Sequence, residues 1–158
     1  MNELPIGIKL VFFDGEECTF QYGEHDGLWG SRFQAENWEK SGLLKNCRGM
    51  ILLDMVGDKD LAFTVPQNVD PELRKWVWEE AGRLKYEKHL TDFHGEILDD
   101  HVPFLEKGIP ALVLIDFLYG PGNSYWHTPQ DQLDKLSKES LKCAGDLALA
   151  VVWRIAGQ

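Results

Sequence analysis

The sequence predicts an α/β domain of three layers, with a mainly parallel or mixed β-sheet between helices. Three apolar runs, at residues 7–13, 50–56 and 111–115, have the length and composition of buried strands. Helical patterns separate them, and such alternation favours parallel pairing with helices on both faces. Sheets of this class usually contain more than three strands, so these runs do not account for a whole sheet.

The helices have recognisable starts and ends. The first is expected at about residues 28–40, ending at Ser41-Gly42. Asp70-Pro71-Glu72 predicts a helix start, because the aspartate caps the helix, proline suits its first position and glutamate complements its dipole. A short helix is expected at about residues 101–107, with Asp100 as N-cap. The last, at about residues 137–155, is apolar nearly all round and is expected to be largely buried.

Composition limits the classes of protein. The 158 residues fit one domain over residues 1–158, and 44% hydrophobic content with six tryptophans argues against disorder. A formal net charge of −10 makes nucleic acid and anionic membranes poor partners. No apolar run is long enough for a membrane span, and no signal peptide is recognisable. The three cysteines show no CxxC spacing, so the compartment stays undecided.

Acidic and histidine side chains follow the predicted strands. Glu16 and Glu17 come after the first strand, and Asp54 lies in the second near its end. Because ligands of open α/β sheets bind beyond the carboxyl ends of strands, these side chains are expected to meet there, joined by Asp99 and His127 from loops. A catalytic zinc takes three ligands of these types, and a separate carboxylate then serves as general base.

Each of these residues also has a purely structural interpretation. Glu16-Glu17 fits a solvated acidic turn, Asp54 fits a turn cap, and His127 fits a hydrogen-bonded loop histidine. The remaining surface histidines occupy positions typical of solvated side chains: His25, His89 and His94.

Four stretches make the chain similar to the glutaminyl cyclases and the related co-catalytic zinc aminopeptidases. They are Val11-Phe12-Phe13-Asp14-Gly15-Glu16-Glu17, Leu52-Leu53-Asp54-Met55-Val56-Gly57, Asp99-Asp100-His101-Val102-Pro103-Phe104 through Gly108-Ile109-Pro110, and Trp126-His127-Thr128. The resemblance covers nearly the whole chain. It implies a phosphorylase/hydrolase-like zinc exopeptidase fold and zinc as cofactor.

The resemblance also implies a role for each site residue. Glu16 corresponds to the general acid or base, and Glu17 and His127 correspond to zinc ligands. Asp54 corresponds to a metal ligand in the aminopeptidases and to a member of the catalytic acid network in the cyclases. Asp99 corresponds to a further catalytic acid of the cyclase network.

Two features favour the cyclase branch. The aminopeptidases usually have a small residue where Asp99 stands, and tyrosine where Trp126 stands. The resemblance places Trp126 in the substrate pocket, and we expect Tyr22 to bind substrate too. In a cyclase the amine of an N-terminal glutamine attacks its own γ-amide, zinc polarises the carbonyl, and Glu16 carries the proton to the leaving ammonia. An aminopeptidase would use the same glutamate to activate water, on a peptide with a free N-terminus.

One departure from the family is large. Family members carry a preceding half with several strands and with a histidine and an aspartate that complete the metal site, whereas here Met1 lies just before residues 7–13. We therefore expect an N-terminally truncated domain that is weakly active or inactive alone, and a self-associated form that covers the open sheet. A non-catalytic remnant that binds peptides or partners is the alternative. Family members are often secreted or periplasmic, but this chain does not reveal its location.

Overall fold

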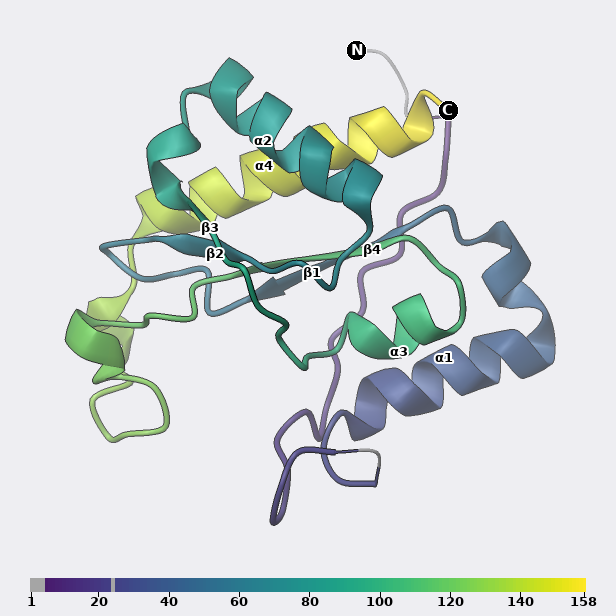
Figure 1. The fold of residues 1–158 in the computed structure, drawn as a ribbon, viewed down its shortest axis with the longest axis horizontal. Helices are drawn as coiled ribbons and strands as arrows, with labels where there is room; N and C mark the ends of the chain where they lie inside the picture. The colour runs from purple at the N-terminus through teal and green to yellow at the C-terminus, as the bar shows by residue number, and fades with distance from the viewer. Residues whose placement is uncertain (1–4, 24) are drawn as a thin grey trace.

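The computed structural model describes residues 5–23 and 25–158. A mixed four-stranded sheet with the order β1-β4-β2-β3 lies between two layers of helices (Figure 1). The strands are β1 (Met50–Asp54), β2 (Phe63–Val65), β3 (Leu90–Asp92) and β4 (Ala111–Ile115). The helices are α1 (Trp29–Ser41), α2 (Pro71–Leu84), α3 (Val102–Glu106) and α4 (Lys138–Ala156), with short 3-10 helices η1 (Leu43–Asn46), η2 (Glu87–His89), η3 (Pro121–Asn123) and η4 (Leu133–Lys135).

Strand β4 is the centre of the sheet, and all five of its residues are buried. It pairs in parallel with β1, with Met50 opposite Ala111 and Asp54 opposite Ile115. On its other side it meets β2 in antiparallel fashion at Thr64, and β2 pairs in parallel with β3. The three-layer α/β class with a mixed sheet is confirmed. Strands β2 and β3 were not predicted, because three-residue strands are too short to show a period of two.

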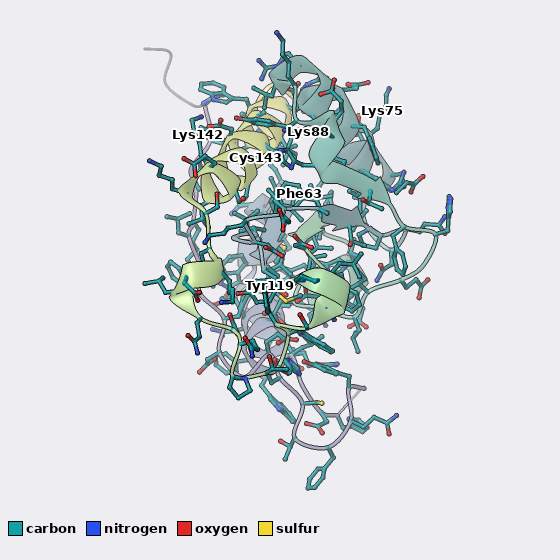
Figure 2. All side chains as sticks on the ribbon, turned by 90° about the vertical axis from the view of Figure 1, so that its left-hand side faces the viewer. Phe63, Lys75, Lys88, Tyr119, Lys142 and Cys143 are labelled. Carbon is teal, nitrogen blue, oxygen red and sulfur yellow. The ribbon has the colours of Figure 1, made fainter. Side chains whose placement is uncertain are left out.

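One helical layer holds the larger core. Helices α2 and α4 pack side by side on one face of the sheet, where Phe63 and Cys143 point inward (Figure 2). The predicted start of α2 is confirmed, because the Asp70 carboxylate accepts hydrogen bonds from the backbone N–H groups of Glu72 and Leu73 at 2.9 and 3.0 Å. No helix in the described part of the chain has the length and apolar character to cross a membrane.

The opposite layer is thinner and surrounds Phe104. Helices α1 and α3 lie there (Figure 1), and the Phe104 ring is 5.9 Å from the ring of Phe13 and 6.1 Å from that of Trp38. Gly42 ends α1 in the left-handed conformation, at the position expected from Ser41-Gly42. This layer contains the start of α1, whose backbone bonds to residues 14–16 and so positions Glu16 and Glu17.

The prediction of a buried strand at residues 7–13 is wrong. The segment is extended and belongs to no strand, and Leu10 and Phe12 are 82% and 94% exposed. It passes from the α2/α4 layer, where Ile6 packs, to the α1/α3 layer, where Phe13 packs. A groove separates it from β1, so no neighbouring strand can bond to its backbone, and apolar composition alone does not bury it.

Three smaller predictions also need correction. Strand β1 ends at Asp54 rather than at residue 56 and is only half-buried, because it forms an edge of the sheet. Helix α4 is buried along one face only, and its other face exposes Leu141, Leu149 and Trp153. Asp100 does not cap α3; the N-cap position is His101, without a side-chain cap, and Asp100 is itself buried.

Candidate active site

Glu16 and Glu17 are placed by a backbone ladder to the start of α1. The N–H groups of Leu28, Trp29 and Gly30 donate to the carbonyl oxygens of residues 16, 15 and 14 at 2.8, 2.9 and 3.0 Å. A side chain at Gly30 would lie 2.5 Å from the carbonyl oxygen of Asp14, so the close approach requires glycine. The two glutamates are therefore held although the segment before them pairs with no strand.

The loop after the glutamates is held by its own polar contacts. The Asp26 carboxylate accepts hydrogen bonds from the N–H groups of Thr19, Phe20 and Gln21 at 2.7, 2.7 and 3.1 Å. The Arg32 guanidinium donates to the carbonyl oxygens of Gly23 and Gly27 at 2.7 and 3.2 Å. The loop thereby turns back toward the glutamates.

Tyr22 reaches from this loop to both glutamates. Its hydroxyl lies 2.6 Å from Glu17 Oε2 and 3.0 Å from Glu16 Oε1. A tyrosine has one hydroxyl proton and donates it to one carboxylate at a time. Burial, followed by the hydrogen bonds to the two glutamates, raises the pKa of Tyr22, so the phenol stays protonated near neutral pH. Tyr22 thus links the two carboxylates.

His127 contacts Glu17, although the two residues lie 110 positions apart in the sequence. Its Nε2 lies 2.6 Å from Glu17 Oε1, and its ring stacks on Trp126 with centroids 4.0 Å apart. Trp126 in turn packs against Phe117, just beyond β4. His127 has a φ of 54° and Met55, directly after Asp54, has a φ of 48°, which are uncommon values for residues other than glycine. Both bends occur at the site.

The five predicted chemical residues line one cavity of about 410 Å³. They are Glu16, Glu17, Asp54, Asp99 and His127, and Tyr22 and Trp126 line it as well. Tyr119 and Asp131, which were not predicted, also line the cavity and are joined by a 2.7 Å hydrogen bond. Their sequence signal was weak: Tyr119 opens a Gly- and Pro-containing loop, and Asp131 lies four residues after His127.

Not every acid at the end of a predicted strand belongs to the site. Asp116 follows β4 and is fully buried outside this cavity. Its carboxylate accepts hydrogen bonds from the N–H groups of Ala62 and Leu118 at 2.9 and 3.2 Å. It therefore ties the chain before β2 to the end of β4, which is a structural role.

Burial and mutual repulsion raise the pKa of three acids in the cavity, Glu16, Asp54 and Asp99. Burial raises the pKa of Glu16, with smaller contributions from the charges of Glu17 and Asp54. Burial also raises the pKa of Asp54, and burial followed by the charge of Asp54 raises the pKa of Asp99 to about 8. Asp99 is 3% exposed, and its Oδ2 has no hydrogen-bond partner among the described residues. At neutral pH Asp99 is thus mainly an uncharged acid.

The residues present do not complete a zinc site. Glu17 and His127 offer the oxygen and nitrogen donors that zinc prefers, and they face each other. However, His127 Nε2 and Glu17 Oε1 are hydrogen-bonded directly to each other, with no space for a metal ion between them. Within residues 5–23 and 25–158 no group of three or more His, Cys, Asp or Glu side chains is arranged to hold a metal ion. Among the described residues, Glu17 and His127 therefore face each other without a third side chain placed to join them on a metal ion.

The chain thus combines a mixed α/β sheet with paired glutamates and a facing histidine at one cavity. It belongs to peptidase family M28, whose model matches residues 1–152.

Among its relatives, a glutaminyl-peptide cyclotransferase of Drosophila melanogaster is 33% identical over 151 residues, covering 83% of this chain and 42% of that protein. The crystal structure of a glutaminyl cyclase from an Acidobacteriales bacterium is 36% identical with a TM-score of 0.87, covering 92% of this chain and 52% of that one.

A leucine aminopeptidase precursor from Bacteroides thetaiotaomicron has a similar structure. Its chain is 30% identical with a TM-score of 0.75, and the match covers 90% of this chain and 51% of that one. The present chain thus spans about half the length of these relatives. The comparisons therefore establish its family and fold, and the activity of a whole relative does not pass to it directly.

Proposed function

We propose that this chain provides the proton-transfer half of a glutaminyl cyclase site, which receives a peptide with N-terminal glutamine. The observation that carries the proposal is the single cavity in which Glu16, Asp54 and Asp99 lie beside Trp126. The cavity is rich in carboxylates, which suits the free amine of a peptide N-terminus, and the indole offers an apolar surface for the side chain. The glutaminyl cyclases among its relatives support this substrate class.

The proposed chemistry needs one group that both accepts and donates a proton. The α-nitrogen of glutamine bonds to its own Cδ, the bond from Cδ to the amide nitrogen breaks, and ammonia leaves. Glu16 takes a proton from the attacking amine and delivers one to the leaving nitrogen. Its raised pKa brings the two protonation states closer in energy near neutral pH. Tyr22 holds Glu16 beside Glu17, and Asp99 supplies an uncharged acid next to this pair.

The chain alone is expected to bind such peptides and to turn them over very slowly. Two ligand-type side chains do not fix the three-ligand geometry of a catalytic zinc, and misplacement by about 1 Å costs on the order of 10²-fold in rate. The same reasoning predicts that a polypeptide completing the site restores cyclisation, and that Glu16→Gln then abolishes it.

Calorimetry with a short glutaminyl peptide and its Nα-acetylated form tests the binding step. We expect the free amine to bind and acetylation to weaken binding at least about tenfold, because the acetylated nitrogen carries no charge for the carboxylates. Equal affinity for the two peptides would remove the basis for an amine site. Mass spectrometry, with added zinc and with a chelator, measures cyclisation in the same samples. Rapid turnover that a chelator stops would show that the incomplete metal site has been misjudged.

Aminopeptidase activity is the second candidate, supported by the structural similarity to the leucine aminopeptidase precursor. Leucyl and glutaminyl peptides separate the two, since release of free leucine identifies hydrolysis and loss of ammonia identifies cyclisation. A chain that binds both peptides and never reacts, even with a completing polypeptide, fits the non-catalytic remnant instead.

A further inference from the structure

One wall of the candidate active-site cavity is an irregular loop. Glu96, Ile97, Leu98 and Asp99 all line the cavity, yet residues 93–101 belong to no helix or strand. The loop joins β3 to α3, so no strand pairing among the described residues fixes the part that carries Asp99. A buried acid keeps a defined place in a cavity only if other contacts hold its backbone to the rigid part of the fold.

The side chain of Asn68 holds this loop at Ile97. Its Nδ2 donates a hydrogen bond to the Ile97 carbonyl oxygen at 2.8 Å, and its Oδ1 accepts one from the Ile97 N–H at 3.0 Å. One side-chain amide therefore satisfies both backbone groups of one residue, as a neighbouring strand would do. Two contacts made by one planar amide fix the orientation of this backbone as well as its position.

The backbone of Asn68 holds the loop a second time, at His101. The His101 Nε2 lies 3.0 Å from the Asn68 carbonyl oxygen, and the imidazole is fully buried. Because a carbonyl oxygen only accepts, Nε2 carries the proton of this ring. Burial lowers the pKa of His101 to about 4, so the ring stays neutral near neutral pH. Asn68 thus bonds to the loop two residues before and two residues after Asp99.

Asn68 is itself held by the rigid part of the fold. Val69 is buried in the larger core, and the N–H of Asp70 donates to the carbonyl oxygen of Ala111 in β4 at 2.8 Å. Asp70 is also the N-cap of α2. Asn68 does not line the cavity, so it acts on a ligand there only through the loop.

We propose that Asn68 is a positioning residue, which holds the Asp99 carboxyl at its place in the cavity by fixing the backbone on both sides of it. Its effect on a glutaminyl peptide rests on the proposed function, whereas its effect on the loop does not. Loss of the side-chain amide leaves the contact with His101 and removes both contacts at Ile97. The loop should then loosen or shift while the sheet keeps its structure.

NMR of the native state tests the effect of Asn68→Ala on the loop. Backbone order parameters of residues 97–100 are expected near about 0.85 in the wild type and below about 0.6 in the variant, with β4 unchanged. The N–H of Asp100 bonds to Asp99 Oδ1 at 2.6 Å, so a shift of its amide proton resonance reports a displaced carboxyl. A role in stability alone would change neither signal in the folded chain. Wild-type values of both, or equal loosening of β4, would overturn the proposal.

Two further variants keep this test specific. Gln67→Ala is the matched control: Gln67 precedes Asn68, its exposed side-chain amide bonds to His94 at 3.2 Å, and its loss should leave both NMR signals at wild-type values. Asn68→Asp has nearly the same shape and loses only the donor to Ile97, so it should fold and loosen the loop as well. A control that loosens the loop equally would contradict a specific role of Asn68.

Calorimetry with a short glutaminyl peptide tests the consequence for the site. Asn68→Ala should weaken binding by about fivefold or more, and by less than about twofold when Asp99→Ala has already removed the carboxyl. Equal weakening in both backgrounds, or none in either, would show that Asn68 does not act through Asp99. A wild-type chain that binds no peptide would refute the proposed function, and the NMR signals would still decide whether Asn68 positions the carboxyl.

Discussion

Replacing Asp99 with asparagine should stabilise the protein at neutral pH and flatten the dependence of its stability on pH. The carboxyl is buried, and burial followed by the charge of Asp54 raises its pKa from 3.8 to about 8. Asparagine has nearly the same shape and never ionises. Its side-chain oxygen can keep the 2.6 Å hydrogen bond that Asp99 Oδ1 accepts from the N–H of Asp100.

The sign and size follow from proton linkage. Below pH 3.8 both the folded and the unfolded chain hold this proton, so Asp99 adds no pH dependence. Between 3.8 and about 8 the unfolded chain releases the proton while the folded chain keeps it, so the free energy of unfolding falls as the pH rises. The fall is about 1.4 kcal/mol per pH unit, which gives an upper limit of about 4 kcal/mol at pH 7. Above pH 8 the contribution is constant.

Urea unfolding, followed by tryptophan fluorescence from pH 5 to 8 at low protein concentration, measures the effect. We expect Asp99→Asn to exceed the wild type in stability by an amount that grows with pH, and Asp60→Asn, at an exposed position, to follow the wild type. Two curves of equal slope for wild type and Asp99→Asn, or a loss of stability at pH 7, would refute the reasoning from burial.

Three further outcomes are expected. Gly30→Ala should lower the free energy of unfolding by about 1–3 kcal/mol in urea unfolding, because its Cβ would meet the Asp14 backbone. A variant as stable as the wild type would contradict the close approach of residues 14 and 30. Asp70→Ala should cost about 1 kcal/mol and Asp70→Asn much less, measured in the same way, since only alanine removes the cap of α2. His127→Ala should weaken zinc binding at least about tenfold in calorimetry, whereas unchanged affinity would show that zinc binds elsewhere.

Local signals in the sequence predicted much of the fold correctly. The cap and proline at Asp70-Pro71 fixed the start of α2, and the continuous apolar run at 111–115 became the buried centre of the sheet. Segment 7–13 has an equally apolar run, but the prediction of a buried strand there is wrong. Burial of a strand depends on neighbouring segments that its own sequence does not specify. Strands β2 and β3 were missed for the opposite reason. Each pairs with a neighbouring strand, but three residues are too few to show a strand pattern in the sequence.

The five predicted residues line one cavity even though the segment that leads to Glu16 pairs with no strand, and the structure gives the reason. Glu16 and Glu17 are held by the bonds between residues 14–16 and 28–30 rather than by the sheet. Asp54 ends β1, whose pairing with β4 is independent of segment 7–13. The sequence signal for these residues was the order of acids after predicted strands, and in the structure each acid reaches the cavity through a different local contact.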